Sequence, residues 1–316
     1  MQNKQNTKLP WNDYSSYIKR IFGIRVQKIS IDAGFTCPNR DGKISRGACF
    51  YCTNESFSPF YCTPKLSVTE QLQKGIEFFS KKYKTQKYLA YFQSYTNTYG
   101  KVEDLKKLYL EALAVEGVIG LVIATRPDCI DEEIMKMLKE ISKDKYLSIE
   151  YGAESTKNET LNFINRGHSW EQTIKAVELA NNFQINCGLH FIIGLPGEDK
   201  TDFLNHAKKI SKLNIQTLKI HQMQVLKKTK LADVYKESPE LFYNLNLENY
   251  LDLMVEFLGY LNPNVVVERF TSESPKEMII YPNWKGKKNF EISHMLEKKM
   301  NERKITQGMF FEANSI

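Results

Sequence analysis

Residues 37–52 read CPNRDGKISRGACFYC, directly after an alternating run at 26–33 that predicts a β-strand. Two residues separate Cys49 from Cys52, and eleven residues separate Cys37 from Cys49. Cysteine thiolates are the usual ligands of iron–sulfur clusters. Three thiolates on one loop would hold three irons of a [4Fe–4S] cluster and leave the fourth iron open to another ligand. The stretch therefore predicts a metal cluster at the end of the first strand.

The main alternative for these three cysteines is a zinc site. A structural zinc ion takes four nitrogen or sulfur ligands. Cys62 is a possible fourth ligand, but no second C-x2-C pair and no H-x3-H pair follows it. The remaining cysteines, Cys129 and Cys187, are isolated, as buried small hydrophobic residues often are. The spacing favours a cluster over zinc or no metal.

Composition sets broad limits on the class of protein. The chain has 316 residues, and its hydrophobic fraction of 42% is sufficient for a sizeable core. The net charge of +7, from 44 Lys+Arg against 37 Asp+Glu, permits a polyanionic partner and equally fits ordinary surface charge. Residues 1–8 are polar and no run of about 18 apolar residues occurs, so we expect no signal peptide and no membrane partner. Six cysteines without a secretion signal indicate the reducing cytoplasm.

Strand-like and helix-like segments alternate along the chain. Predicted strands lie at 26–33, 87–93, 120–125, 146–151, 184–193 and 216–225, and predicted helices at 10–22, 69–83, 102–114, 131–143, 158–182 (two pieces) and 200–213. Such alternation predicts an α/β fold with a parallel sheet. Six units cannot close an eight-stranded barrel, so we expect an open, partial (β/α)6 TIM-like barrel, with a doubly wound sheet as the competing fold. In both, ligands bind at the carboxyl ends of the strands, where the cysteines lie.

The expected division of the chain has three parts. Residues 1–25 form a lead-in, 26–230 the barrel core, and 231–316 a small α/β C-terminal extension packed on the barrel. The extension contains a predicted helix at 247–261, a strand at 265–270 and a basic helix at 290–303. Whether these segments continue the barrel or cover its mouth is open at this level.

The cysteine stretch resembles the cluster loop of radical S-adenosylmethionine (SAM) enzymes. In that superfamily three cysteines follow the first strand, and an aromatic residue, here Tyr51, precedes the last of them. The commonest spacing is C-x3-C-x2-C. The C-x11-C-x2-C spacing and the sequence Cys-Pro-Asn-Arg-Asp-Gly at 37–42 resemble instead a bacterial YhcC/YtqA-like subfamily, near the Elp3-like and coproporphyrinogen-dehydrogenase-like branches. The likeness extends from about Pro10 through Gly308.

This resemblance implies a [4Fe–4S] cluster and SAM as cofactors. The methionine end of SAM would chelate the open iron, and reductive cleavage would give a 5′-deoxyadenosyl radical that abstracts a substrate hydrogen. An electron donor such as flavodoxin or ferredoxin is implied. So is a tRNA substrate, with conversion of the wobble-uridine side chain from carboxymethylaminomethyl toward aminomethyl. The alternatives are radical chemistry on a small metabolite or porphyrin-like molecule, and a non-catalytic metal-containing protein for nucleic-acid binding or electron transfer. An electron carrier would normally give every iron a cysteine.

The resemblance also implies SAM contacts at the strand ends. These are Tyr51 beside the cluster, Gln93 and Ser94 for the ammonium group, Glu154 (or, alternatively, Glu150) for the ribose, Arg166 for the carboxylate, and Gly194 beside the adenine. The usual Gly-Gly-Glu motif is absent after the second strand. Each of these residues has a structural alternative: a helix cap, a surface charge or a turn. Ser169 and Gln172, at capping-box spacing, predict the start of the second helical piece after Arg166.

Six further residues are candidates for substrate contact. They are Arg40 and Lys43 in the loop between the first two cysteines, Arg126 after the third strand, His190 and His221 in the fifth and sixth strands, and Lys287 in the basic tail near Trp284. The alternatives are core histidines, a simple turn at Arg126, and a solvated loop at Lys287. The loop between Cys37 and Cys49 could cover the cluster or contact the substrate.

Overall fold

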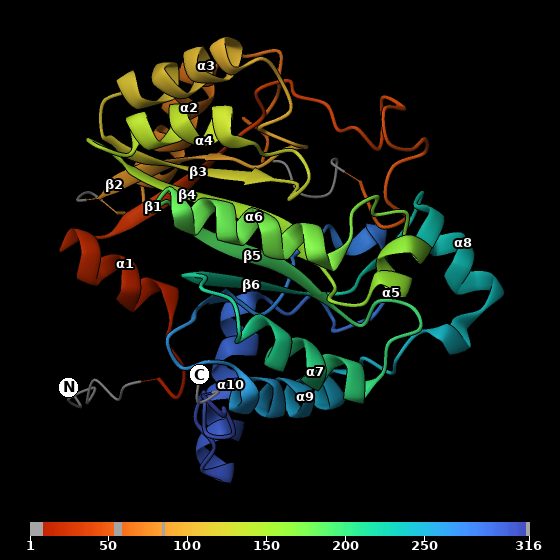
Figure 1. Ribbon diagram of the computed structural model, residues 1–316. Coiled ribbons are helices and arrows are strands. Elements are labelled where there is room, and N and C mark those ends of the chain that lie inside the picture. The colour runs from red at the N-terminus through yellow and green to blue at the C-terminus, as the bar shows by residue number, and fades with distance from the viewer. Residues whose placement is uncertain (1–8, 54–58, 84–85, 314–316) are drawn as a thin grey trace.

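The computed structural model describes residues 9–53, 59–83 and 86–313, so the polar stretch 1–8 lies outside the described residues. A parallel sheet of seven strands forms its centre (Figure 1), in the order β1-β2-β3-β4-β5-β6-β8. The strands are β1 (Val26–Ile31), β2 (Lys87–Phe92), β3 (Val118–Thr125), β4 (Tyr146–Glu154), β5 (Asn186–Ile193), β6 (Thr217–Gln222) and β8 (Val266–Arg269). The first six neighbours follow chain order, which confirms the predicted partial barrel.

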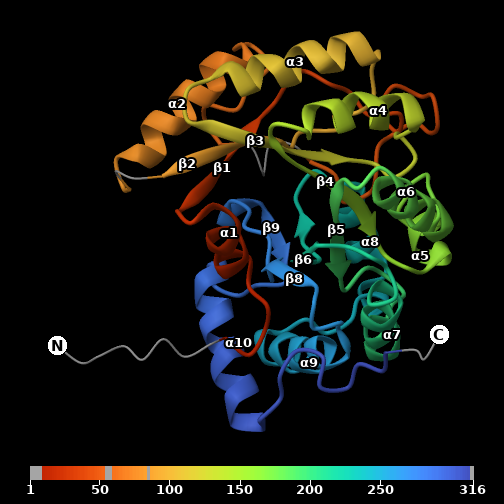
Figure 2. The same cartoon turned by 60° about the vertical axis from the view of Figure 1, so that its left-hand side comes forward.

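Helices alternate with these strands. They are α1 (Tyr14–Phe22), α2 (Val68–Ser80), α3 (Val102–Ala114), α4 (Glu132–Ile141), α5 (Asn158–Phe163), α6 (Trp170–Asn182), α7 (Lys200–Ile210), α8 (Lys230–Glu237), α9 (Leu247–Tyr260) and α10 (Asn289–Arg303). Figure 2 shows the sheet curved, with α2, α3, α4, α6 and α7 around its outside. Ser169 and Gln172 form the predicted capping box at the start of α6. The two helical pieces predicted at 158–182 are therefore α5 and α6.

Alternate strand positions divide the sheet into two chemically different faces. Residues such as Ile29, Phe92 and Ile123 are fully buried in the main hydrophobic core, against the helices. The residues between them face the concave side, where Tyr91 and Val122 belong to a separate, smaller hydrophobic cluster. Since side chains alternate along a strand, one face of each strand builds the core and the other lines the inside of the half-barrel.

The C-terminal part of the chain contributes to the same sheet. Strand β8 pairs in parallel with β6 as a seventh strand, and α8 and α9 lie between them in the chain. The predicted strand at 216–225 is divided into β6 and a short β7 (Val225–Leu226), which pairs antiparallel with β9 (Ile279–Tyr281). The sequence had left open whether this region continues the barrel. The pairing of β8 shows that part of it does.

The open edge between β1 and β8 is bordered by the N-terminal segment. Asp13 pairs with Val267 of β8 and also caps α1 by accepting a hydrogen bond from the backbone of Ser16. Trp11 packs edge-on against Phe270, with ring centroids 5.1 Å apart. Among the described residues, no helix combines the length and apolar character needed to cross a bilayer.

Candidate active site

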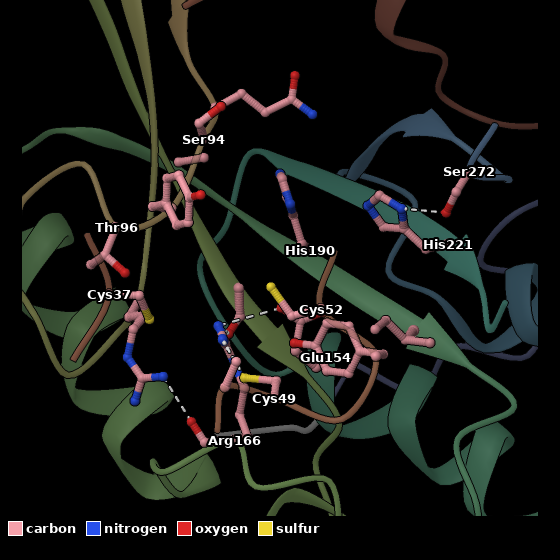
Figure 3. Close-up of a pocket in the computed structure, with 18 of the residues that line it drawn as sticks. Cys37, Cys49, Cys52, Ser94, Thr96, Glu154, Arg166, His190, His221 and Ser272 are labelled. Carbon is pink, nitrogen blue, oxygen red and sulfur yellow. Dashed lines mark hydrogen bonds and ion pairs between the residues drawn. The ribbon is translucent and has the colours of Figure 1, made fainter. Parts of the chain in front are cut away.

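A pocket at the carboxyl ends of the strands contains all three predicted ligand cysteines (Figure 3). Its walls also include residues from the ends of the second to sixth strands and of β8. The lining residues used below are Arg40, Tyr51, Cys62, Gln93, Ser94, Arg126, Glu150, Gly152, Glu154, Arg166, His190, His221, Gln222, Arg269 and Ser272. The parallel sheet has thus gathered polar groups from distant parts of the chain at one place.

The loop that carries the cysteines is held in place by Asn39. Its side chain is fully buried, and its amide nitrogen donates to the backbone oxygens of Asn165 at 2.7 Å and Arg166 at 2.8 Å. Gly167 allows this approach, because a Cβ there would lie 2.6 Å from the Asn39 amide oxygen. Within the loop, the Cys37 carbonyl accepts from the backbone of Arg40 at 2.7 Å. The residues between Cys37 and Cys49 therefore attach the cluster loop to the segment between α5 and α6.

Hydrogen-bond donors lie near the sulfur atoms of Cys49 and Cys52. The Asn39 amide nitrogen lies 3.5 Å from Cys49 Sγ, and an Arg166 guanidinium nitrogen lies 3.7 Å from the same atom. Arg40 lies 3.6 Å from Cys52 Sγ. Burial raises the pKa of Cys52, and Arg40 acts to lower it. Such donors to sulfur also tune the potential of an iron–sulfur cluster.

The donor set fits an iron–sulfur cluster. Three thiols line one pocket, and thiolates are the ligands that such clusters use. Among the described residues, no three His, Cys, Asp or Glu side chains converge to hold a single metal ion. In a cluster each of the three cysteines would bind a different iron, so their sulfur atoms need not converge on one point.

Arg166 and Glu154 lie together beside Cys49. The Arg166 guanidinium donates to the Gly152 carbonyl at 2.6 Å and lies 3.4 Å from a Glu154 carboxylate oxygen. Gly152 leaves room for this contact, since a Cβ there would lie 2.4 Å from the guanidinium. Burial raises the pKa of Glu154, while Arg166 and a hydrogen bond with Tyr51 act to lower it. Arg166 Nε is buried without a hydrogen-bond partner among the described residues, so the guanidinium retains one free donor.

A local irregularity of β4 places Glu154 in the pocket. The pairing of β4 with β5 shifts between Gly152 and Glu154, and Glu154 has a positive φ of 68°. Such backbone is uncommon for a residue with a side chain and often marks a functional position. Here it turns the carboxylate toward Arg166.

The end of β2 supplies the polar pair Gln93 and Ser94. The Gln93 amide oxygen accepts a hydrogen bond from the Ser30 hydroxyl at 2.9 Å, and Ser94 is buried. Asn97, in the same segment, donates from its side chain to the carbonyls of Phe92 and Ala124. Asn97 therefore holds this turn against β3, while Gln93 and Ser94 face the pocket.

Glu150 is part of a closed ring of four charges on the concave face. Lys28 lies 2.6 Å from both Glu150 and Glu268, and Lys219 lies 2.6 Å from Glu150 and 3.1 Å from Glu268. Burial would raise the pKa of Glu150, but the two lysines hold it well below its usual value. This explains why Glu150 is less suited than Glu154 to contact a ligand: its oxygens are already engaged.

His190 contacts this group of four charges through Glu150. Its Nε2 donates to a Glu150 carboxylate oxygen at 2.6 Å, since a carboxylate can only accept. Burial, with a further contribution from Lys219, lowers the pKa of His190 to about 4. The imidazole of His190 is therefore neutral, and the hydrogen bond to Glu150 places its proton on Nε2. His221 lies next to it, with ring centroids 5.5 Å apart.

Arg126 lines the pocket but is occupied by protein partners. It forms two hydrogen bonds with the Asp128 carboxylate, at 2.9 and 2.7 Å, and donates to the Arg166 carbonyl at 2.8 Å. Burial would lower its pKa, and Asp128 raises it. This geometry makes Arg126 a support for the segment that carries Arg166.

Three predicted contact residues do not line the pocket. The Cα of Gly194 packs against Leu245: a Cβ at position 194 would lie 2.2 Å from a Leu245 methyl group. Lys43 is exposed, with its ammonium 5.2 Å from the centre of the Tyr99 ring. Lys287 lies 3.4 Å from Glu291 at the start of α10.

Several residues of the site were not singled out by the sequence. They are Lys28, Lys219, Glu268, Arg269 and Ser272. A signal was present for two of them: Lys219 alternates with the apolar residues Leu218 and Ile220 of β6, and Arg269 ends β8. Charged residues at such positions of a parallel sheet point to its concave face or its ligand-binding edge.

Comparisons with known proteins agree with this site. A family model described as the Radical SAM superfamily matches residues 37–210, and a Radical_SAM C-terminal domain model matches residues 215–302. The chain is 32% identical over 307 residues to the uncharacterized protein YtqA of Bacillus subtilis, covering 97% of this chain and 94% of that protein.

Two further comparisons cover less of the other protein. The chain is 33% identical over 122 residues to a tRNA uridine(34) acetyltransferase of Methanocaldococcus jannaschii, which covers 37% of this chain and 22% of that protein. In fold it resembles Elp3 of Methanocaldococcus infernus, with a TM-score of 0.68 and 18% identity. That match covers 89% of this chain and 64% of the Elp3 chain, so the protein spans less than two thirds of its length.

The first match spans more than half of the chain and includes all three cysteines of the pocket. Together with the full-length similarity to YtqA, it shows that the chain belongs to the Radical SAM superfamily, whose enzymes use a [4Fe–4S] cluster and S-adenosylmethionine.

Proposed function

We propose that this protein is a radical SAM enzyme that acts on the wobble uridine of tRNA, converting a carboxymethylaminomethyl side chain toward aminomethyl. The observation that carries the proposal is the shared pocket of Cys37, Cys49 and Cys52 with polar residues of six strand ends. When bound, the cluster and SAM would supply a 5′-deoxyadenosyl radical that takes a hydrogen atom from the carboxymethyl carbon. Loss of one further electron, back to the cluster, would give an imine, and water would then break the C–N bond and release the two-carbon unit as glyoxylate. The protein's own groups bind, orient and shield the reactants.

In this proposal Cys37, Cys49 and Cys52 hold the cluster, and Arg166 binds the SAM carboxylate. Arg166 lines the pocket, and its planar guanidinium suits that contact. Glu154, beside Arg166, faces the ribose. Tyr51 lies next to the cluster loop and shares a hydrogen bond with Glu154.

The remaining SAM contacts come from β2 and from the segment after β5. Gln93 and Ser94 receive the ammonium group, for which the Gln93 oxygen and the Ser94 hydroxyl are suitable acceptors. The adenine would lie beside the backbone that follows Ile192, which lines the pocket, rather than at Gly194 itself. His190 and His221 then form the wall that faces the substrate.

The choice of tRNA rests on three supports. One relative is named as a tRNA uridine(34) acetyltransferase, and position 34 is the wobble position. The chain has a net charge of +7, which suits a polyanion. Arg40 and Lys43 lie on the loop that borders the pocket, where they could approach the phosphates around a uridine inserted into it.

The proposal also includes the division of the chain, the electron donor and the cellular compartment. Residues 26–230 form the catalytic core, and 231–316 complete its substrate side. A flavodoxin or ferredoxin supplies the electron, in the cytoplasm.

The test uses anaerobically reconstituted protein and tRNA from a strain that lacks the gene. Wild type should bind about four irons per chain, as the cluster type requires. It should form 5′-deoxyadenosine with dithionite and convert the modified uridine, measured by mass spectrometry of nucleosides. Cys49→Ala should lose iron and both activities. Cys62→Ala is the matched control, because Cys62 lies outside the loop of residues 37–52 and packs in the main hydrophobic core, so it should be dispensable.

The possible results test the cluster assignment and the tRNA substrate separately. A colourless protein with one zinc, or loss of the cluster in Cys62→Ala, would contradict the three-cysteine assignment. SAM cleavage with no change in any tRNA nucleoside would keep the radical SAM chemistry and reject the tRNA substrate.

A further inference from the structure

Arg269 differs from the other arginines that line the pocket. Arg126 is paired with Asp128, and Arg166 with Glu154. A guanidinium nitrogen of Arg40 lies 3.6 Å from Cys52 Sγ, and this sulfur carries negative charge when it binds iron. None of the ion pairs among the described residues includes Arg269, whose polar contacts are to the ring of His221. Its Nε is buried without a hydrogen-bond partner in the described part of the chain.

The carboxylates nearest in the sheet are already engaged. Glu268 precedes Arg269 on β8, and its two oxygens lie 2.6 Å from Lys28 and 3.1 Å from Lys219. Glu150 contacts the same two lysines and His190. Three cations therefore face two carboxylates on the concave side, which leaves one positive charge at Arg269. A partly buried charge without a counterion is costly, so this position favours an anion.

The surroundings of Arg269 hold it in a defined position. An Arg269 guanidinium nitrogen lies 3.0 Å from His221 Nδ1 and 3.5 Å from Nε2, so the guanidinium lies over the imidazole ring. Burial, together with Arg269, keeps the pKa of His221 well below its usual value, so the ring is neutral. The Ser272 hydroxyl lies 2.8 Å from His221 Nδ1. Ser272 is in turn fixed by Gln222, which accepts from its backbone nitrogen at 2.7 Å and donates to its carbonyl at 3.2 Å.

These groups lie in the same pocket as the cysteines but on another wall. Figure 3 shows His221 and Ser272 on the opposite side of the pocket from Cys37. A substrate that occupies the space between them would present one end to the cluster side and the other to Arg269. Arg269 lines the pocket, and its planar guanidinium can offer two parallel donors, the geometry that suits a carboxylate.

We propose that Arg269, positioned by His221 and Ser272, is the subsite for the carboxylate end of the substrate. For the identity of that substrate this inference rests on the proposed function: the group bound is the carboxylate of the carboxymethylaminomethyl side chain. The product lacks this carboxylate, so the subsite also distinguishes substrate from product. A polyanionic backbone phosphate is the other source of negative charge, and the test separates the two.

The experiment compares two anticodon stem-loops that differ only in the wobble side chain, one carboxymethylaminomethyl and one aminomethyl. Dissociation constants for both RNAs, and kcat and KM for the carboxymethylaminomethyl RNA, are measured with reconstituted holoenzyme and SAM for wild type, Arg269→Gln and Arg269→Lys. Arg303→Gln, which removes a surface arginine paired with Asp252, is the control. Iron content and SAM cleavage without RNA verify that each variant folds with its cofactors.

Wild type should bind the carboxylate-bearing RNA at least about tenfold more tightly, as a charged hydrogen-bonded pair allows. Arg269→Gln should lose this preference and show a higher KM, Arg269→Lys should recover part of the preference, and Arg303→Gln should retain it. Retention of the preference in Arg269→Gln would overturn the subsite. Equal weakening of both RNAs would also overturn it, because that is the result of a phosphate contact.

A failure of the proposed function is recognised separately, because wild type would then convert neither RNA. The anion subsite is in that case judged with acetate alone, from the line width of its carboxyl-labelled ¹³C resonance in the presence of holoenzyme. Broadening that disappears in Arg269→Gln but not in Arg303→Gln supports the subsite. Equal broadening in all three proteins rejects it.

Discussion

Arg166 and Asn39 show how single residues connect the cluster loop to the barrel. Asn39 joins the loop to the backbone of residues 165 and 166, and Arg166 returns to Cys49 and to the carbonyl of Gly152. Asn39 therefore joins the cysteine loop to the segment between α5 and α6, and Arg166 joins that segment to Cys49 and to the end of β4. A loop with eleven residues between two ligands would otherwise have considerable conformational freedom, and these contacts limit it.

His190 provides a prediction about pH at the residue level. In the unfolded chain a histidine titrates near 6.5, whereas burial lowers the pKa of His190 in the folded protein to about 4. Between these values the unfolded chain binds more protons, so the folded protein loses stability as the pH falls from 6.5 to 4. The shift corresponds to roughly 3 kcal/mol at most.

The His190→Gln variant should therefore show a shallower decline in the free energy of unfolding over this pH range, measured by urea denaturation. Glutamine can still donate to Glu150 but does not titrate. His168 and His221, whose pKa values are also lowered by burial, keep part of the dependence in both proteins. His294→Gln, at a solvent-exposed position, is the control. Parallel pH profiles for wild type and His190→Gln would contradict the assignment.

At the level of elements, the strands combine an apolar outer face with a polar inner face. The sequence predicted the positions of the first six strands within a few residues, because their hydrophobic patterns are strong and local. It did not show that β6 ends at Gln222 and that β7 follows in a separate sheet. The whole run from 216 to 225 is rich in strand-forming residues, and only the pairing with β9 distinguishes the two pieces.

Close packing between β5 and β6 gives a prediction at this level. Gly188 is paired with Thr217, and a Cβ at position 188 would lie 1.9 Å from the Thr217 hydroxyl oxygen and 2.7 Å from its carbonyl oxygen. Because the carbonyl belongs to the sheet backbone, it cannot move freely. Gly188→Ala should lower the free energy of unfolding by about 1–3 kcal/mol, measured by urea denaturation.

Gly100→Ala is the matched control for this substitution. A Cβ at position 100 would make only ordinary contact, at 3.5 Å from Leu105. Gly100→Ala should change stability by less than about 1 kcal/mol. An equal effect of the two substitutions would show that the β5–β6 contact is not the cause.

At the level of the whole molecule, Gln307 joins the two ends of the chain. Its side chain accepts from the backbone of Asn12 at 2.9 Å and donates to the carbonyls of Asn262 and Val265, both at 2.8 Å. Its backbone nitrogen donates to Pro10. These contacts hold the N-terminal segment beside β8, where it borders the open edge of the half-barrel (Figure 2).

Gln307→Ala should lower the free energy of unfolding by about 2–3 kcal/mol, because it leaves buried backbone groups without partners. Calorimetric or denaturant unfolding measures the loss. Gln73→Ala, at an exposed position of α2, should have little effect. Comparable stability of Gln307→Ala and wild type would show that these hydrogen bonds are replaced by water without cost.

The sequence alone determined the kind of fold and the location of its chemistry. The cysteine spacing and the strand–helix periodicity are local properties, so they could be read without the structure. The tertiary structure decided which residues meet. Lys28, Glu150, Lys219 and Glu268 come from four strands as far apart as 240 positions in the chain. Arg269 remains without an acid because those lysines engage both nearby carboxylates. Such pairings depend on the register of neighbouring strands and on competition between charges, which no local pattern contains.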